Sequence, residues 1–123
     1  MSSTRERGLA YLRKVMSDNT SVSKFYDVDE SWTKSPVWWF DVPIRKVKDE
    51  SIKMFLLLCQ KSPTSEDFHI LVIPKRVFIE NMSQFEISEE EIIRLHLSAE
   101  PHNIFTDIRG HNFDFSKFCV NEL

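Results

Sequence analysis

Glycine and cysteine are both scarce in this sequence. Its 123 residues include only two glycines, Gly8 and Gly110, which are too few and too far apart for a phosphate-binding loop or a dinucleotide-binding fingerprint. The two cysteines, Cys59 and Cys119, each stand near large apolar residues. We therefore expect buried thiols in a reducing, cytoplasmic compartment, with a single disulfide between them as the alternative. We expect no bound cofactor unless a divalent metal is held.

Long apolar runs are also missing. The longest uninterrupted run, 54–59, is far shorter than the roughly 20 residues that cross a bilayer, so we expect no membrane-spanning helix. The first residues of the chain are polar and charged, which argues against a secretory signal. The formal net charge is −3, and a mildly acidic chain is a poor general binder of phosphate backbones.

Aromatic and other apolar residues are plentiful, and they come in short segments. Hydrophobic residues make up 41% of the chain and aromatic residues 12%, which suffices for the core of a single domain over 1–123. The pattern predicts an α+β fold with an antiparallel or mixed sheet of four to six strands, an N-terminal helix and a second helix after the third strand. Helices are predicted over 4–17, 23–28 and 75–84, strands over 37–42, 52–60, 68–73 and 94–100, and a helical turn over 116–120.

Two of these strands, 52–60 and 68–73, are separated by a short polar loop, which predicts an antiparallel hairpin. A register centred on Thr64 places Cys59 opposite His69, and directly opposed side chains lie close together. A cysteine beside a histidine can act as a thiolate nucleophile. Because Cys59 shares its strand face with large apolar residues, the pattern favours a packed thiol instead.

A proline and a basic pair follow two of the predicted strands, 37–42 and 68–73. If both strands pair with 52–60, they run parallel to each other and end at the same edge of the sheet. The simpler interpretation is that each proline ends its strand and the basic residues solvate the next turn. Under the first interpretation, four basic side chains form a cluster for a phosphate or an acidic protein face: Arg45, Lys46, Lys75 and Arg76.

Polar residues alternate along the predicted strand 94–100, so they share one face. Histidine and carboxylate side chains can together hold a divalent cation such as Zn²⁺, although neither an HExxH nor a paired CxxC motif is present. A solvated outer face with charge pairs is the alternative. The candidate metal ligands on and just after this strand are His96, Glu100, His102 and Asp107.

Three tryptophans lie in or near the predicted strand 37–42. Both faces of that strand carry large rings, so both must be covered, either within the chain or by another chain. Tryptophan is common among interface anchors, and packing within the monomer is the alternative. The candidate interface residues are Trp32, Trp38 and Trp39.

These patterns favour a small soluble protein-binding module of the inhibitor, immunity or accessory-subunit type, without a catalytic centre of its own. Its partner is another protein or a second copy of the chain. The alternative is a nucleic-acid-binding or metal-dependent nuclease-like module that uses the basic pairs and the histidine–carboxylate strand. Against a nuclease, no lysine here follows an acidic residue by two positions, which is a spacing typical of restriction-type nucleases.

Overall fold

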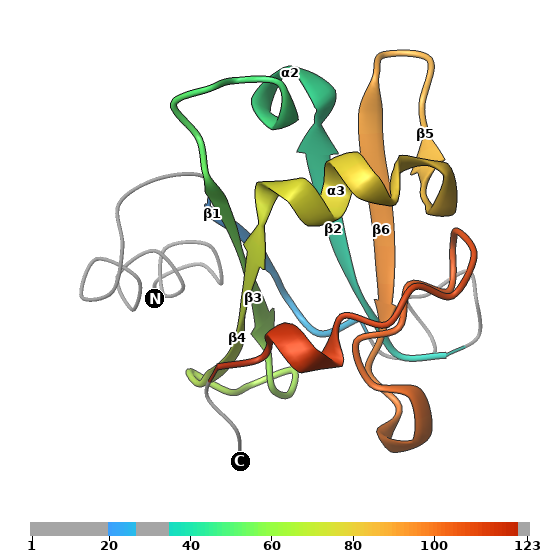
Figure 1. Cartoon of the computed structure of the whole chain (residues 1–123). Helices are drawn as coiled ribbons and strands as arrows, with labels where there is room; N and C mark the ends of the chain where they lie inside the picture. Colours follow the sequence, from blue (N-terminus) through green and yellow to red (C-terminus); the bar gives the residue numbers. More distant parts are fainter. Residues whose placement is uncertain (1–19, 27–34, 121–123) are drawn as a thin grey trace.

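The computed structural model describes residues 20–26 and 35–120 and places the strands in two three-stranded sheets (Figure 1). The first sheet, in the order β1-β3-β4, consists of β1 (Thr20–Ser23), β3 (Met54–Gln60) and β4 (Phe68–Pro74). The second sheet, in the order β2-β6-β5, consists of β2 (Val37–Pro43), β6 (Ile92–Ser98) and β5 (Glu86–Ile87). The α+β class is thereby confirmed, but the strands form two sheets where one was expected. The predicted helix over 4–17 and Trp32 lie outside the described residues.

Short helices follow two of the strands. Pro43 and Pro74 end β2 and β4, because proline has no N–H for the ladder, and their φ angles of −63° and −60° suit the turn into a helix. The predicted helix over 75–84 is confirmed, although it is split in two. The helical elements are α2 (Ile44–Val47), α3 (Lys75–Glu80) and the 3₁₀ turns η1 (Met82–Gln84), η2 (Pro101–Asn103) and η3 (Ser116–Phe118). Within the described ranges, no helix is long and apolar enough to cross a membrane.

Strands β3 and β4 form the predicted antiparallel hairpin, with Cys59 opposite His69. Both faces of the hairpin are buried because its residues are apolar on both sides. One face of β3, including Phe55 and Leu57, joins the main core. The other face forms a smaller cluster of Leu56, Leu58, Phe68 and Ile70.

The expected pairing of 37–42 with 52–60 is wrong, because another strand occupies that edge of β3. Strand β1 runs there, parallel to β3, with Val22 opposite Leu58. Strand β2 pairs instead with β6 in antiparallel fashion over its whole length. Alternation in β2 sends Trp38 inward and Trp39 outward, which gives the second sheet one apolar face and one mixed face.

The predicted helix over 23–28 is also wrong in its described part. Ser23 is the last residue of β1, and Tyr26 forms an antiparallel bridge with Val37 at the start of β2. The bridge ties the first sheet to the second. It also places the Tyr26 side chain beside the outward side of β2.

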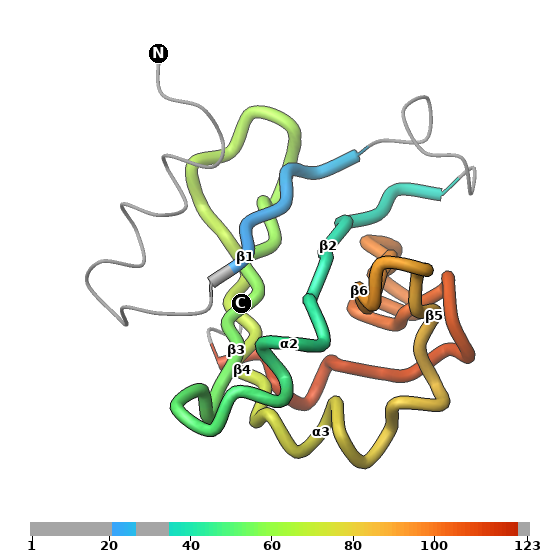
Figure 2. The backbone as a smooth tube through the Cα atoms, turned by 90° about the horizontal axis from the view of Figure 1, so that it is seen from above, coloured from blue at the N-terminus to red at the C-terminus, as the bar shows by residue number. Residues whose placement is uncertain are grey.

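The two sheets face each other across a shared core (Figure 2). Seen from above, β3 and β4 lie on one side of the molecule and β6 and β5 on the other. The indole Nε1–H of Trp38, which is only 1% exposed, donates a 2.7 Å hydrogen bond to the carbonyl oxygen of Gln60 and so links the sheets. Helix α3 closes one end with Val77 and Phe78.

The chain that follows β6 folds back along it. A β-bridge joins Leu97 to Asp107, and the backbone N–H of Ile108 donates to the carbonyl oxygen of His96 at 2.9 Å. The segment then crosses to β4, where Cys119 pairs with Leu71. This return path brings the loop 107–111 to the edge of β6.

Candidate functional site

The outward face of the β2-β6-β5 sheet combines charged and aromatic side chains, and we call it the outer face. Register places Trp39 opposite His96, Asp41 opposite Arg94, and Arg94 opposite Glu86. A hollow of about 230 Å³, which we call the outer hollow, opens on this face. It is lined by Trp39, Phe40, Asp41, Arg94, Leu95, His96 and Arg109.

Three rings stack side by side across the outer face. The Tyr26 and Trp39 ring centroids lie 4.6 Å apart with planes inclined by 23°. The Trp39 and His96 centroids lie 5.0 Å apart with planes inclined by 11°. At the far end, the Lys24 Nζ sits 4.8 Å from the Tyr26 ring centroid. We call Tyr26, Trp39 and His96 the ring ladder.

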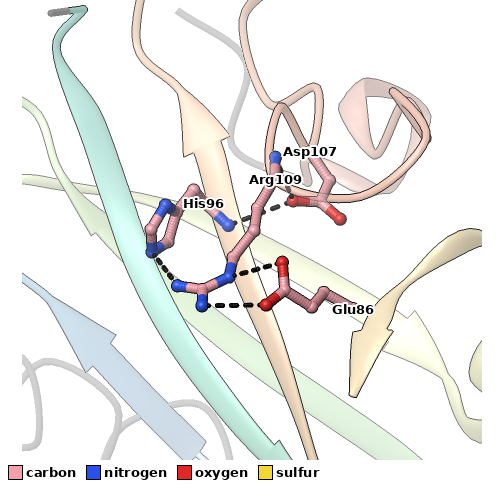
Figure 3. Close-up of polar contacts among 4 residues, drawn as sticks. All are labelled: Glu86, His96, Asp107 and Arg109. Carbon is pink, nitrogen blue, oxygen red and sulfur yellow. Dashed lines mark hydrogen bonds and ion pairs between the residues drawn. The ribbon is translucent and has the colours of Figure 1, made fainter. Parts of the chain in front are cut away.

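Arg109 continues the ring ladder at its other end (Figure 3). Its Nη1 lies 3.1 Å from Nε2 of His96, while Nη2 and Nε lie 3.0 Å and 2.9 Å from the two carboxylate oxygens of Glu86. The guanidinium therefore sits between an imidazole and a carboxylate. A two-pronged contact with a carboxylate fixes the plane of the guanidinium as well as its position.

Burial and charge decide the protonation states here. Removal from water, and then the neighbouring Arg109 cation, lower the pKa of His96 to about 4, so the imidazole is neutral at pH 7. The hydrogen bond from Arg109 lowers the pKa of Glu86, which keeps that carboxylate ionised. The contact of Arg109 with His96 is thus that of a cation with a neutral acceptor.

Asp107 holds the loop that carries Arg109. Its side chain is fully buried, and Oδ1 accepts hydrogen bonds from the backbone N–H groups of His96 at 3.1 Å and Arg109 at 3.2 Å. Burial raises the pKa of Asp107. Gly110 packs so closely on the backbone of Gln84 and Phe85 that a Cβ there would meet the Gln84 carbonyl oxygen.

The four predicted metal ligands do not come together. His96 meets Asp107 through its backbone, and its side chain is only 6% exposed. Glu100 and His102 form a separate pair, with Oε2 and Nδ1 3.3 Å apart. Residues 20–26 and 35–120 contain no group of three or more His, Cys, Asp or Glu side chains that could hold a metal ion. The expected open polar face is buried at His96 and Ser98, because the return segment covers the end of β6.

The predicted basic residues follow β2 and β4, which belong to different sheets, so the argument from a shared sheet edge fails. Helices α2 and α3 nevertheless contact each other. Arg45 lines a hollow with Glu90 and Glu91, whereas Lys46 lines a different one with Ser21. On α3, Arg76 is exposed and the Nζ of Lys75 donates to the Asp49 carbonyl oxygen at 2.9 Å. A shared anion site of Arg45, Lys46, Lys75 and Arg76 stays a prediction.

The Cys59 and His69 pair has the predicted register but not the chemistry of a nucleophile. Cys59 is fully buried, and burial raises the pKa of its thiol well above the usual range. His69 packs against Trp38 and Phe105, with ring centroids 5.7 Å and 5.2 Å away, and burial lowers its pKa. Both groups are neutral packing elements at pH 7.

The site contains residues that sequence reasoning did not single out. Period-two alternation identified His96, and the aromatic segment identified Trp39. Tyr26, Glu86 and Arg109 were missed, because no local pattern reports a residue that reaches the site from a neighbouring strand or loop. Comparison with protein-family models, curated proteins and solved structures finds no match for this chain.

Proposed function

We propose that this chain is a protein-binding module and that its partner docks on the outer face. The observation that carries the proposal is the ring ladder, which ends on the paired Arg109. Tyrosine, tryptophan and arginine are enriched among the few residues that carry most of the binding energy at protein interfaces. Tyr26, Trp39 and Arg109 are all partly exposed on one face, where a partner can reach them.

Prior ordering of these side chains supports the proposal. Immobilising a flexible side chain at an interface costs about 0.5–1.5 kcal/mol. The Trp39 ring is already stacked on both sides, and Arg109 is already held by Glu86 and His96. A partner that docks on these groups therefore spends little of its binding energy on ordering them.

The same contacts make a nucleic acid a poorer fit than a protein. Single-stranded nucleic acids bind by stacking bases on open aromatic faces. Both faces of Trp39 are covered by Tyr26 and His96. The outer face also mixes cations with the acids Asp41 and Glu86, so it presents no uniform positive field to a phosphate backbone.

An inhibitor, immunity protein or accessory subunit would use such a face. A cytoplasmic setting suits Cys59 and Cys119, which are not joined in a disulfide. The partner is a different protein in this proposal, and a second copy of the chain is an outcome that the experiment below distinguishes.

The test begins with a partner captured on the immobilised chain, which is then purified and titrated by calorimetry. Trp39→Ala and, separately, Tyr26→Ala are expected to weaken binding at least tenfold, a loss of roughly 1.4 kcal/mol or more. The matched control is Ile79→Ala, an apolar truncation at a side chain that is 53% exposed on α3. It should leave the dissociation constant within twofold. Circular dichroism confirms that each variant is folded.

The proposal is overturned if both folded outer-face variants bind the partner as the wild type does. It is also overturned if only oligonucleotides bind and Arg45→Glu with Arg76→Glu abolishes that binding, since this outcome assigns the function to the basic residues. Sedimentation analysis covers the remaining case. Self-association that is lost in Trp39→Ala would make the partner a second copy of the chain and overturn the assignment to a different protein.

A further inference from the structure

We infer that the outer hollow receives the carboxylate of an aspartate or glutamate side chain presented by the partner protein, with Arg94 as the group that binds it. The inference rests on the proposed function, because it names the chemistry of the partner at the same face. Its central observation is that Arg94 and Arg109 line one hollow but differ in how far their donors are already used.

Arg109 has little left to offer a ligand. All three guanidinium nitrogens have a partner, two on Glu86 and one on His96. Its role toward a ligand is to keep the wall of the hollow rigid.

Arg94 is in the opposite situation. Its Nε is buried and has no hydrogen-bond partner in the part of the chain that the structure describes. Its ion pair with Glu90 is long, with Nη2 and Oε2 3.8 Å apart, and the Glu90 side chain is 72% exposed. Exposed pairs of this kind contribute little, whereas a buried N–H without an acceptor carries a free-energy cost that an incoming acceptor removes.

Charge pairing around the hollow leaves Arg94 as the cation for a ligand. Glu86 neutralises Arg109, His96 is neutral at pH 7, and Asp41 is the one acid in the lining. A carboxylate brings one negative charge to Arg94, whereas a phosphate dianion would bring two beside Asp41. The planar fork of arginine also matches the two oxygens of a carboxylate.

The size and walls of the hollow suit an acidic side chain. Its volume of about 230 Å³ is several times the ~30 Å³ that a water molecule occupies in the liquid. The rings of Trp39 and His96 line the hollow, whereas Phe40 and Leu95 also border it but belong to the buried core behind the sheet. The methylene groups of an aspartate or glutamate can therefore rest on apolar surface while the carboxylate reaches Arg94.

The first experiment uses acetate as the probe and nuclear magnetic resonance of the ¹⁵N-labelled chain as the readout. The Nε–H signal of Arg94 is assigned as the one lost in Arg94→Gln. We expect that signal to shift saturably as acetate replaces chloride at constant ionic strength. Arg76→Gln, at an exposed arginine on α3, is the matched control and should keep the response. Inorganic phosphate, titrated in the same way, should bind several-fold more weakly.

The inference fails if the Arg94 signal shows no saturable shift, if Arg94→Gln leaves the acetate response of the neighbouring outer-face signals intact, or if phosphate binds more tightly than acetate. Titration of the purified partner separates this failure from failure of the proposed function. If Trp39→Ala loses tenfold or more in affinity for the partner and Arg94→Gln loses none, docking on the outer face is supported. The inference that Arg94 binds a carboxylate of the partner is then overturned. In the opposite outcome, acetate binds at Arg94 but both variants bind the partner as the wild type does. Arg94 then binds anions, and both the proposed function and the role of this site in docking are overturned.

Discussion

Nη1 of Arg109 lies 3.1 Å from Nε2 of His96, so a permanent cation is hydrogen-bonded to a histidine. An arginine nitrogen can only donate, and Nε2 must therefore be the acceptor. The proton of the neutral His96 ring is consequently on Nδ1. This contact determines a tautomer as well as a position.

The tautomer is directly testable. Long-range ¹H–¹⁵N correlation spectra at pH 7 should show His96 as a neutral ring protonated on Nδ1. In Arg109→Gln the amide can present either an oxygen or an N–H group, so the preference for this tautomer should weaken. A positively charged His96 ring at pH 7 in the wild type would contradict the arrangement.

The lowered pKa of His96 makes the stability of the fold depend on pH. The unfolded state takes up a proton below about pH 6.5, whereas the folded state does so only near pH 4. Stability is therefore fully present above pH 6.5 and is lost as pH falls toward 4. From this shift, the free energy of unfolding should be about 2 kcal/mol lower at pH 5 than at pH 7.5.

Urea titrations at the two pH values measure this difference, with His96→Gln as the control. Burial lowers the pKa of His69 too, which adds a slope of the same sign, whereas the raised pKa of Asp107 acts in the opposite direction. The quantity to compare is therefore the change between wild type and variant. Equal pH slopes in the two proteins would show that His96 does not titrate as described.

Gly110→Ala should disturb the site indirectly, by displacing the loop that carries Arg109. A Cβ at Gly110 would meet the carbonyl oxygen of Gln84 and lie 2.8 Å from Oδ2 of Asp107, and backbone atoms cannot move aside easily. We expect a loss of about 1–3 kcal/mol in the free energy of unfolding, as for other overpacked positions. Displacement of the loop should also release Arg109, so the pKa of His96 should rise toward 6.5.

Asn112→Gly provides the matched control on the same loop. Asn112 has a φ of 63°, a conformation that glycine adopts without strain, and its side chain is exposed. This change should alter stability by less than about 0.5 kcal/mol. If Gly110→Ala were equally mild, the close packing of the loop on Gln84 would be wrong.

Trp38 and Trp39 should lose different amounts of stability on the same substitution. Trp38→Phe removes the 2.7 Å hydrogen bond to Gln60 and leaves space in the core, which should cost about 2–4 kcal/mol. Trp39→Phe keeps a ring between Tyr26 and His96 on the outer face and should cost less than about 1 kcal/mol. Chemical denaturation of the two variants measures both values, and equal losses would contradict the inward and outward assignments.

The elements that local pattern predicts are those whose residues repeat at a clear period. Strands β2, β3, β4 and β6 were all predicted with boundaries close to those observed. The register of Cys59 opposite His69 also followed, because a short loop leaves a hairpin few registers. Polar β1 was missed, since its four residues are too few for a period and its partner lies more than thirty residues away.

The failure to predict β1 led to the incorrect pairing of β2 with β3. With that edge of β3 apparently vacant, β2 was assigned to it, and the basic residues after β2 and β4 were placed at one edge. In the candidate site, too, contacts between distant segments could not be predicted from local sequence patterns. Glu86 and Arg109 meet because the chain returns along β6, and no local sequence pattern encodes that return.

The order of strands along the chain has a consequence for how the outer face forms during folding. β2 and β6 are adjacent in space, yet the β3–β4 hairpin and α3 lie between them in sequence. Closing that long loop costs more entropy than closing the hairpin, so the hairpin should form first and the β2–β6 ladder later. Pulse-labelling hydrogen exchange during refolding should accordingly protect Leu57 before Leu95. The outer face should thus be assembled late, and a chain stalled during folding would hold a formed hairpin but no outer face.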